Sequence, residues 1–213
     1  MNRTPQLIAI EGPIGVGKTT LARRLAESLG SDAVFENVDN NPFLERFYQN
    51  RTEAALATQL FFLFQRSQQI HDMRQNDMFA PNRVLDFLIQ KDKLFARVNL
   101  DEEEYKLYCQ VYDRLLIDAP QPDLVVYLQA PTDTLMQRIE NRGVPAERRI
   151  ERSYLEQLNQ AYSEFFLYYD ESPLLIVNSK DIDFANNEID YDILVKQILN
   201  TRSGRHFYNP AML

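Results

Sequence analysis

The sequence is poor in cysteine, histidine and long apolar runs, and each shortage excludes a class of protein. Its single cysteine, Cys109, rules out a disulfide within the chain and is typical of proteins from a reducing cytoplasm. The two histidines, His71 and His206, lack the spacing of a metal site. No run approaches the roughly 20 apolar residues that span a bilayer, and the apolar stretch after the first six residues is too short for a secretory signal. We therefore expect a cytoplasmic protein with no membrane partner.

Positive charge is also scarce. The 213 residues include 23 Lys and Arg against 31 Asp and Glu, which gives a formal net charge of −8. Proteins that bind long nucleic acids gain affinity by neutralising many phosphates, so this charge argues against such a partner. A small phosphorylated ligand in a locally basic pocket remains compatible with it. No linker or repeat divides residues 1–213, and we expect one domain.

The clearest motif that is present follows the first apolar run, in the stretch LIAIEGPIGVGKTT at residues 7–20. The apolar run predicts a buried strand of a parallel sheet, and the residues from Thr19 to Gly30 predict a helix. Between them lies a complete phosphate-binding loop, G-x-x-x-x-G-K-[ST], which binds a nucleoside triphosphate and its Mg²⁺. Its predicted phosphate-binding residues are Gly12, Pro13, Ile14, Gly15, Val16, Gly17, Lys18, Thr19 and Thr20.

Further strands are expected at residues 33–38, 83–86, 123–129 and 174–178, with helices between them. This alternation predicts an α/β fold with a five-stranded parallel sheet flanked by helices. One predicted helix covers residues 87–97. A longer one, at about 52–73, carries an apolar block at residues 60–64 that indicates either a central helix or one shared with another subunit.

Ligands of such folds bind at the carboxyl ends of the strands, where Glu36 and Asp86 are predicted to lie beside the phosphate loop. Glu36 is placed to take a proton from the acceptor of a phosphoryl group; alternatively, it is a surface residue of an edge strand. Asp86 is placed to bind Mg²⁺ beside Thr19; alternatively, it caps the helix that follows.

Other polar residues indicate binding surfaces. Gln59 and Arg66 lie on one face of the long helix, which suits either a binding surface or a solvated stripe. Arg138 and Arg142 precede Gly143, and three more arginines follow within ten residues. This concentration suits triphosphate oxygens, whereas stabilisation of a helix end explains the first two arginines alone.

With these motifs the chain resembles the deoxynucleoside kinases, in particular the bacterial deoxyadenosine and deoxyguanosine kinase branch. The likeness runs from Leu7 to about Leu199, and FENVDNNPFLERFY is similar to the family's E-x-V-x-x-N-P segment. The resemblance implies a P-loop kinase fold with an arginine-rich lid at about 143–152, ATP as the donor, and Mg²⁺ held by Thr19 and Asp86. The acceptor-binding residues that it implies are Glu36, Tyr48, Gln59, Arg66, Asp86, Asp92 and Glu147. The catalytic residues that it implies are Glu36, Lys18, Arg138 and Arg142.

Three positions depart from the family pattern. Where the family has a carboxylate followed by Arg and Ser, this chain has Asp86, Phe87 and Leu88, so the arginine that contacts the reacting phosphates is absent. A further lid arginine is replaced by Val144. We hypothesise that Arg148 or Arg149 replaces the missing charge when the lid closes.

The expected function is transfer of the γ-phosphoryl group of ATP to the 5′-hydroxyl of a deoxynucleoside by a homodimer. A carboxylate at Asp92 that faces the base favours a purine or deoxycytidine over thymidine, because thymine presents a carbonyl acceptor there. The alternatives are a kinase of another small heterocyclic or nucleotide acceptor and a nucleotide-binding regulator that catalyses weakly.

Overall fold

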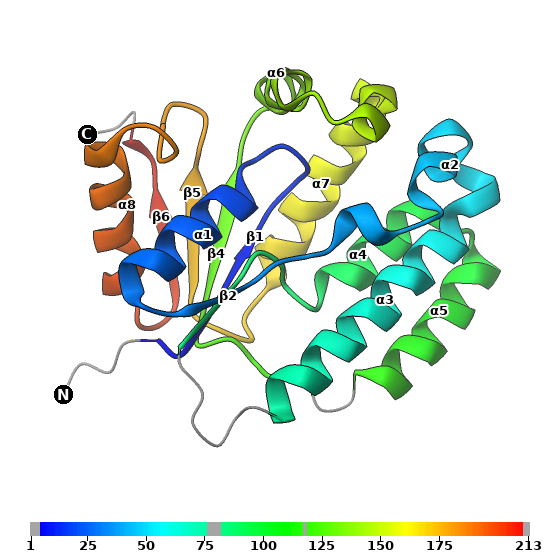
Figure 1. The fold of residues 1–213 in the computed structure, drawn as a ribbon, viewed down its shortest axis with the longest axis horizontal. Helices are drawn as coiled ribbons and strands as arrows, with labels where there is room; N and C mark the ends of the chain where they lie inside the picture. Colours follow the sequence, from blue (N-terminus) through cyan, green and yellow to red (C-terminus); the bar gives the residue numbers. More distant parts are fainter. Residues whose placement is uncertain (1–4, 76–81, 117–118, 211–213) are drawn as a thin grey trace.

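The computed structural model describes residues 5–75, 82–116 and 119–210 of the chain (Figure 1). Within these residues, parallel strands form one sheet in the order β2-β3-β1-β4-β5-β6. The strands are β1 (Leu7–Glu11), β2 (Asp32–Val34), β3 (Arg83–Leu85), β4 (Leu124–Gln129), β5 (Leu174–Asn178) and β6 (Arg205–Tyr208). Since β1 lies between β3 and β4, the loop after it opens near the middle of the carboxyl edge of the sheet.

Helices connect the strands and cover the sheet. They are α1 (Lys18–Leu29), α2 (Leu44–Gln49), α3 (Arg51–Gln75), α4 (Lys91–Asn99), α5 (Glu102–Leu115), α6 (Thr132–Arg142), α7 (Arg152–Tyr168) and α8 (Glu188–Asn200), with the 3-10 turns η1 (Val38–Asn40) and η3 (Pro145–Arg149). Helices α1 and α8 lie side by side, joined by a hydrogen bond of 2.6 Å between Ser28 and Tyr191 (Figure 1). Helix α7 packs on β4, where the rings of Tyr127 and Phe166 stack 4.1 Å apart.

Within the described part of the chain, the buried side chains form two apolar groups. The larger one surrounds the sheet and the inner sides of α1, α7 and α8. The smaller one lies among α3, α4 and α5, which stand together at one side of the molecule (Figure 1), and it includes Phe87. The site residues on α3 and α4 are therefore held by a core of their own beside the sheet.

The predicted parallel α/β sheet is confirmed, but the predicted number of five strands is wrong, because β6 adds a sixth. It pairs with β5 from Leu174 opposite Arg205 to Val177 opposite Tyr208. The sequence assigns no strand to this tail because three of its four residues are exposed, so it lacks the apolar run of a buried strand.

Two element boundaries near the phosphate loop also differ from the prediction. Strand β2 ends at Val34 rather than at residue 38, so Glu36 lies in the connection beyond the strand. Helix α4 begins at Lys91 rather than at Phe87, which leaves residues 86–90 as a turn at the end of β3. As a result, Glu36 and residues 86–90 lie in connections after the strands, next to the loop that follows β1.

The apolar block on α3 is neither fully buried nor fully exposed. Leu63 is inaccessible to solvent, whereas 55% of Phe64 is exposed. None of the helices in the described residues could span a membrane.

Candidate active site

The phosphate loop has the backbone that its glycines predict. Gly12, Gly15 and Gly17 all have positive φ, and a Cβ on Gly12 would lie 2.3 Å from the carbonyl oxygen of Leu128. A side chain there would therefore push the loop away from β4. Lys18 Nζ donates to the carbonyl oxygens of Gly12 at 2.7 Å and of Pro13 at 3.3 Å, so the ammonium is folded back over the loop. Helix α1 begins at Lys18, and its N-terminal N–H groups favour an anion at the loop.

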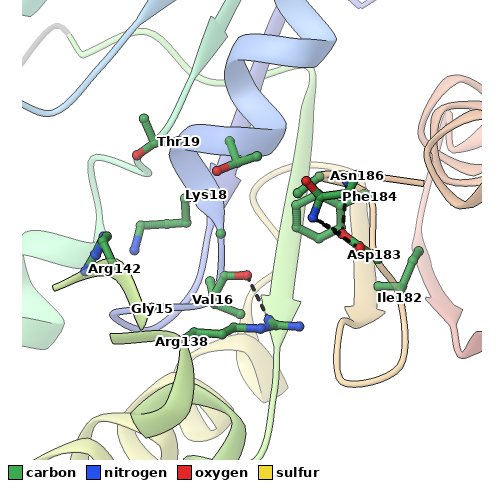
Figure 2. Close-up of a pocket in the computed structure, with 13 residues that line it drawn as sticks. Gly15, Val16, Lys18, Thr19, Arg138, Arg142, Ile182, Asp183, Phe184 and Asn186 are labelled. Carbon is green, nitrogen blue, oxygen red and sulfur yellow. Dashed lines mark hydrogen bonds between the residues drawn. The ribbon is translucent and has the colours of Figure 1, made fainter. Parts of the chain in front are cut away.

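A cavity of about 330 Å³ lies against this loop and α1 (Figure 2). Arg138 and Arg142 of α6 line it together with residues 182–186. Figure 2 shows Arg142 on the side where Lys18 lies, whereas the Arg138 guanidinium donates to the Val16 carbonyl oxygen at 3.3 Å. Arg138 also donates to the Ser179 carbonyl oxygen at 2.6 Å, so it joins α6 to the loop and to the end of β5.

A second cavity, of about 130 Å³, adjoins the first and shares Gly15, Lys18, Thr19 and Arg142 with it. Of the acceptor residues predicted from the sequence, those in its wall are Glu36, Tyr48, Gln59, Asp86, Asp92 and Glu147. Phe62 and Phe95 add aromatic rings to the wall. This is the arrangement that a flat, polar-edged ligand requires: aromatic faces for stacking and a few hydrogen-bonding groups at its edge.

Arg66 lies behind this wall and holds two of its carboxylates. Its Nε and Nη2 donate to the two oxygens of Asp92 at 2.9 and 3.1 Å, and Nη2 also donates to Glu36 Oε1 at 2.6 Å. The Arg66 side chain is 1% exposed. The ring of Phe87 lies against its guanidinium.

Charge and burial oppose each other in this cluster. Burial raises the pKa of Glu36, but Lys91 and Arg66 outweigh that effect and hold it far below its usual range. Burial lowers the pKa of Arg66, and the carboxylates of Asp92 and Glu36 more than reverse this. For Asp92 the balance is different, because burial raises its pKa more than Arg66 and Lys91 lower it. The Glu36 carboxylate therefore stays ionised throughout the physiological range.

Asp86 links the phosphate loop to Glu36. Its Oδ2 accepts from the Thr19 hydroxyl at 2.6 Å and its Oδ1 accepts from the backbone N–H of Glu36 at 2.7 Å. The alternative role of Asp86 as a helix cap is wrong, because the residue before α4 is Gln90. A hydroxyl and a carboxylate oxygen side by side at the loop suit Mg²⁺, which binds to one or two protein oxygens and to the substrate phosphates.

The predicted lid residues make contacts of their own. Glu147, on η3, accepts from Arg142 Nη2 at 2.6 Å, which joins α6 to the wall of the second cavity. Burial, with a smaller effect of the Glu147 carboxylate, raises the pKa of Tyr48, so its hydroxyl stays protonated. Arg148 and Arg149 are exposed, and neither lines the two cavities.

Sequence reasoning missed two buried charged residues, one in the wall of the second cavity and one beside the phosphate loop. Lys91 Nζ donates to Glu36 Oε2 at 2.6 Å, although nothing in the spacing of Lys91 marks it. Glu11 is fully buried at the end of β1, where its carboxylate accepts from the backbone N–H groups of Gly12 and Leu88 and from the Tyr162 hydroxyl. A charged residue that closes an otherwise apolar strand is the signal that could have identified Glu11.

A family model for deoxynucleoside kinases matches residues 8–202 of this chain. The chain belongs to the deoxynucleoside kinase family. It is 36% identical over 203 residues to a deoxyguanosine kinase of Bacillus subtilis (strain 168), a match that covers 93% of this kinase and 98% of that protein. It is 31% identical over 202 residues to a deoxyadenosine/deoxycytidine kinase of the same organism, a match that covers 90% and 91% of the two chains.

The fold gives the same result. A structure of deoxyadenosine kinase from M. mycoides with bound dCTP superposes on this kinase with a TM-score of 0.77 and 28% sequence identity, over 90% of this chain and 97% of that one. The predicted family and fold are thus confirmed, and the protein is an enzyme that phosphorylates deoxynucleosides.

Proposed function

We propose that this kinase transfers the γ-phosphoryl group of ATP to the 5′-hydroxyl of a purine deoxynucleoside or of deoxycytidine in preference to thymidine. One observation carries this proposal: Arg66 binds Asp92 and Glu36 at once, in the wall of a cavity that adjoins the phosphate loop. A base held at Asp92 and a sugar held near Glu36 would present the 5′-hydroxyl toward Lys18. The cavity next to the loop would hold the triphosphate of ATP.

Glu36 is the proposed general base. The 5′-oxygen of the acceptor bonds to the γ-phosphorus while its proton passes to the Glu36 carboxylate. The bond from the γ-phosphorus to the bridging oxygen then breaks, and its electron pair leaves with ADP. The position of Glu36 in the cavity wall with Lys18 and Asp86 supports this role, and its lowered pKa keeps the carboxylate ionised at neutral pH.

The remaining charged residues bind and orient the phosphates. Lys18 and the loop N–H groups hold the β- and γ-phosphates, and Arg138 and Arg142 at the lid stabilise the transferred group. Thr19 and Asp86 would hold Mg²⁺, which neutralises charge on the phosphates when it is bound. Tyr48 and Glu147 are the proposed partners of the sugar 3′-hydroxyl, and their place in the wall of the second cavity supports this.

Base preference follows from the hydrogen-bonding edge that faces Asp92. Both oxygens of Asp92 accept hydrogen bonds from Arg66, so we infer that the carboxylate acts as an acceptor toward the base as well. Adenine and cytosine offer an amino group there and guanine offers its ring N–H, whereas thymine offers a carbonyl oxygen. A buried acceptor that faces another acceptor costs about 1–3 kcal/mol, which corresponds to roughly ten- to a hundredfold in kcat/KM. Gln59, in the same wall, is the second proposed base-binding residue.

A panel of the four deoxynucleosides with ATP tests this function. We expect at least one of deoxyguanosine, deoxyadenosine and deoxycytidine to exceed thymidine in kcat/KM by about tenfold or more. Deoxyguanosine is the first to try, because the similar Bacillus subtilis protein with 36% identity is a deoxyguanosine kinase. Equal or better use of thymidine would contradict the proposed place of Asp92.

We further propose that residues 1–213 act as one domain with a lid at about 143–152, and that two chains form a homodimer. The exposed Phe64 on α3 and Leu107 on α5 support the dimer, because these two helices pack together and both present a large apolar side chain to solvent. A cytoplasmic location is proposed because the reaction consumes ATP and the lone Cys109 suits a reducing compartment.

A further inference from the structure

The second cavity is lined by a buried lysine, Lys91, to which no sequence motif of this chain gives a role. Lys91 is 5% exposed and lines the cavity together with Glu36, Lys18 and Asp86. Its Nζ lies 2.6 Å from Glu36 Oε2, while Arg66 binds the other oxygen of the same carboxylate. The base that we propose is therefore held between two cations, one of which faces the space where the reactants meet.

Lys91 stands where local physics disfavours a lysine. It is the first residue of α4, where the helix dipole repels a positive charge, and it is almost fully buried. A second cation is near, since burial together with the charge of Lys91 lowers the pKa of Lys18. Burial lowers the pKa of Lys91 as well, and the Glu36 carboxylate more than reverses this. The ammonium is thus kept charged by Glu36 in particular.

Protein oxygens hold both lid arginines that we propose for the transferred group. Arg138 donates to the carbonyl oxygens of Val16 and Ser179, and Arg142 binds Glu147. Phe87, which stands at the position of the missing arginine, is fully buried against Arg66 and carries no charge. Transfer of a phosphoryl group nevertheless requires positive charge at the oxygens of that group.

We propose that Lys91 supplies the positive charge that the Phe87 position lacks, first by positioning Glu36 and then by binding the transferred phosphoryl group. When the 5′-hydroxyl proton reaches Glu36, the carboxylate becomes neutral and its ion pair with Lys91 is lost. The ammonium is then released toward the oxygens of the phosphoryl group as the new ester forms. Proton transfer and charge stabilisation are coupled through a single contact. This inference rests on the proposed function.

Lys91→Met tests the proposal. The variant should lose about 100-fold or more in kcat, as when a single charge-stabilising donor is removed, while KM for the deoxynucleoside changes by less than about threefold. Lys91→Arg should recover at least tenfold of that loss, because it restores the charge. The matched control is Lys93→Met on the same helix, since Lys93 pairs with Asp113 at the surface and should leave kcat unchanged.

The pH profile separates this role from a structural one. The ionisable groups that surround Glu36 are Lys18, Tyr48, Arg66, Asp86, Lys91, Asp92 and Tyr162. Because Lys91 lowers the pKa of Glu36, its removal should move the acid limb of kcat/KM for the deoxynucleoside to higher pH. A residue that only supports the fold would leave that limb where it is.

Each outcome decides the proposal. A folded Lys91→Met enzyme with kcat within threefold of the parent, or an unmoved acid limb, overturns it. If Lys91→Met does not fold, the same measurements on Lys91→Gln and Lys91→Arg decide, with the charged variant expected to be the more active one. A loss of kcat in Arg148→Ala/Arg149→Ala with none in Lys91→Met would assign the charge to the lid instead. A parent enzyme inactive on every deoxynucleoside would contradict the proposed function itself and this inference with it.

Discussion

The ring of Phe87 lies against the guanidinium of Arg66, with 4.1 Å between the ring centroid and Arg66 Cζ. Both side chains are buried, at 0% and 1% exposure. Phe87 therefore replaces a charged residue of the family pattern with a flat support beneath the arginine that binds Asp92 and Glu36. The ring packs against the arginine that holds both carboxylates but carries no charge, so we infer that the positive charge comes from another residue.

Phe87→Ala should lower the free energy of unfolding by about 3–5 kcal/mol, because it leaves a cavity in the smaller apolar core and removes the ring from Arg66. It should also weaken deoxynucleoside binding, since Arg66 then holds its carboxylates less firmly. Denaturant unfolding followed by circular dichroism measures the first effect and titration calorimetry the second.

Phe207→Ala is the control, because 73% of Phe207 is exposed on β6 and its loss should cost no more than about 0.5 kcal/mol. A cost below about 1 kcal/mol for Phe87→Ala would show that the ring does not support the arginine.

Asp92→Asn should relax the choice of base. The amide keeps one acceptor and adds an N–H donor, which can bind the thymine carbonyl oxygen. The preference for the best deoxynucleoside over thymidine should fall from about ten- to a hundredfold to within about threefold, measured as a ratio of kcat/KM values.

Asp113→Asn is the matched change at an exposed aspartate, whose partner Lys93 lies at the surface. This variant should keep the parental preference. A preference that is the same in Asp92→Asn as in the parent would mean that another residue reads the base.

Phe64→Asp should separate the dimer. A carboxylate in place of a large exposed apolar side chain on α3 would carry a charge into the proposed interface. Light scattering at micromolar concentration should report about twice the chain mass for the parent and about one chain mass for the variant.

Leu167→Asp, at an exposed position on α7, should leave the parental mass unchanged. A parent that is monomeric throughout this concentration range would contradict the proposed homodimer.

The parts of the fold that could be predicted are those with local signals. The phosphate loop follows from its glycines and lysine, and β5 at Leu174–Asn178 follows from an unbroken apolar run with buried residues. The predicted second strand extends too far, to residue 38, because Phe35 and Val38 are residue types that favour strands. In the structure the backbone N–H of Glu36 is bound by the Asp86 side chain, not by a neighbouring strand.

The family pattern marks residues that the structure brings together in the wall of one cavity, but it does not mark contacts that depend on other residues of this chain. Lys91 and Glu36 are 55 positions apart, and no periodicity links them. The capping alternative for Asp86 failed because the helix after it begins five residues further on, at Lys91. Such contacts depend on how β3, α3 and α4 pack, which the sequence pattern alone does not define.

We propose above all that Glu36, held by Arg66 and Lys91, takes the proton of the deoxynucleoside 5′-hydroxyl. The most direct measurement is kcat of Glu36→Gln with ATP and the best deoxynucleoside, together with the dissociation constant of that deoxynucleoside. The amide has the shape of the carboxylate but cannot accept the proton, so kcat should fall by about 10²–10⁴-fold while the dissociation constant changes little. A Glu36→Gln enzyme that keeps kcat within threefold of the parent would contradict the account.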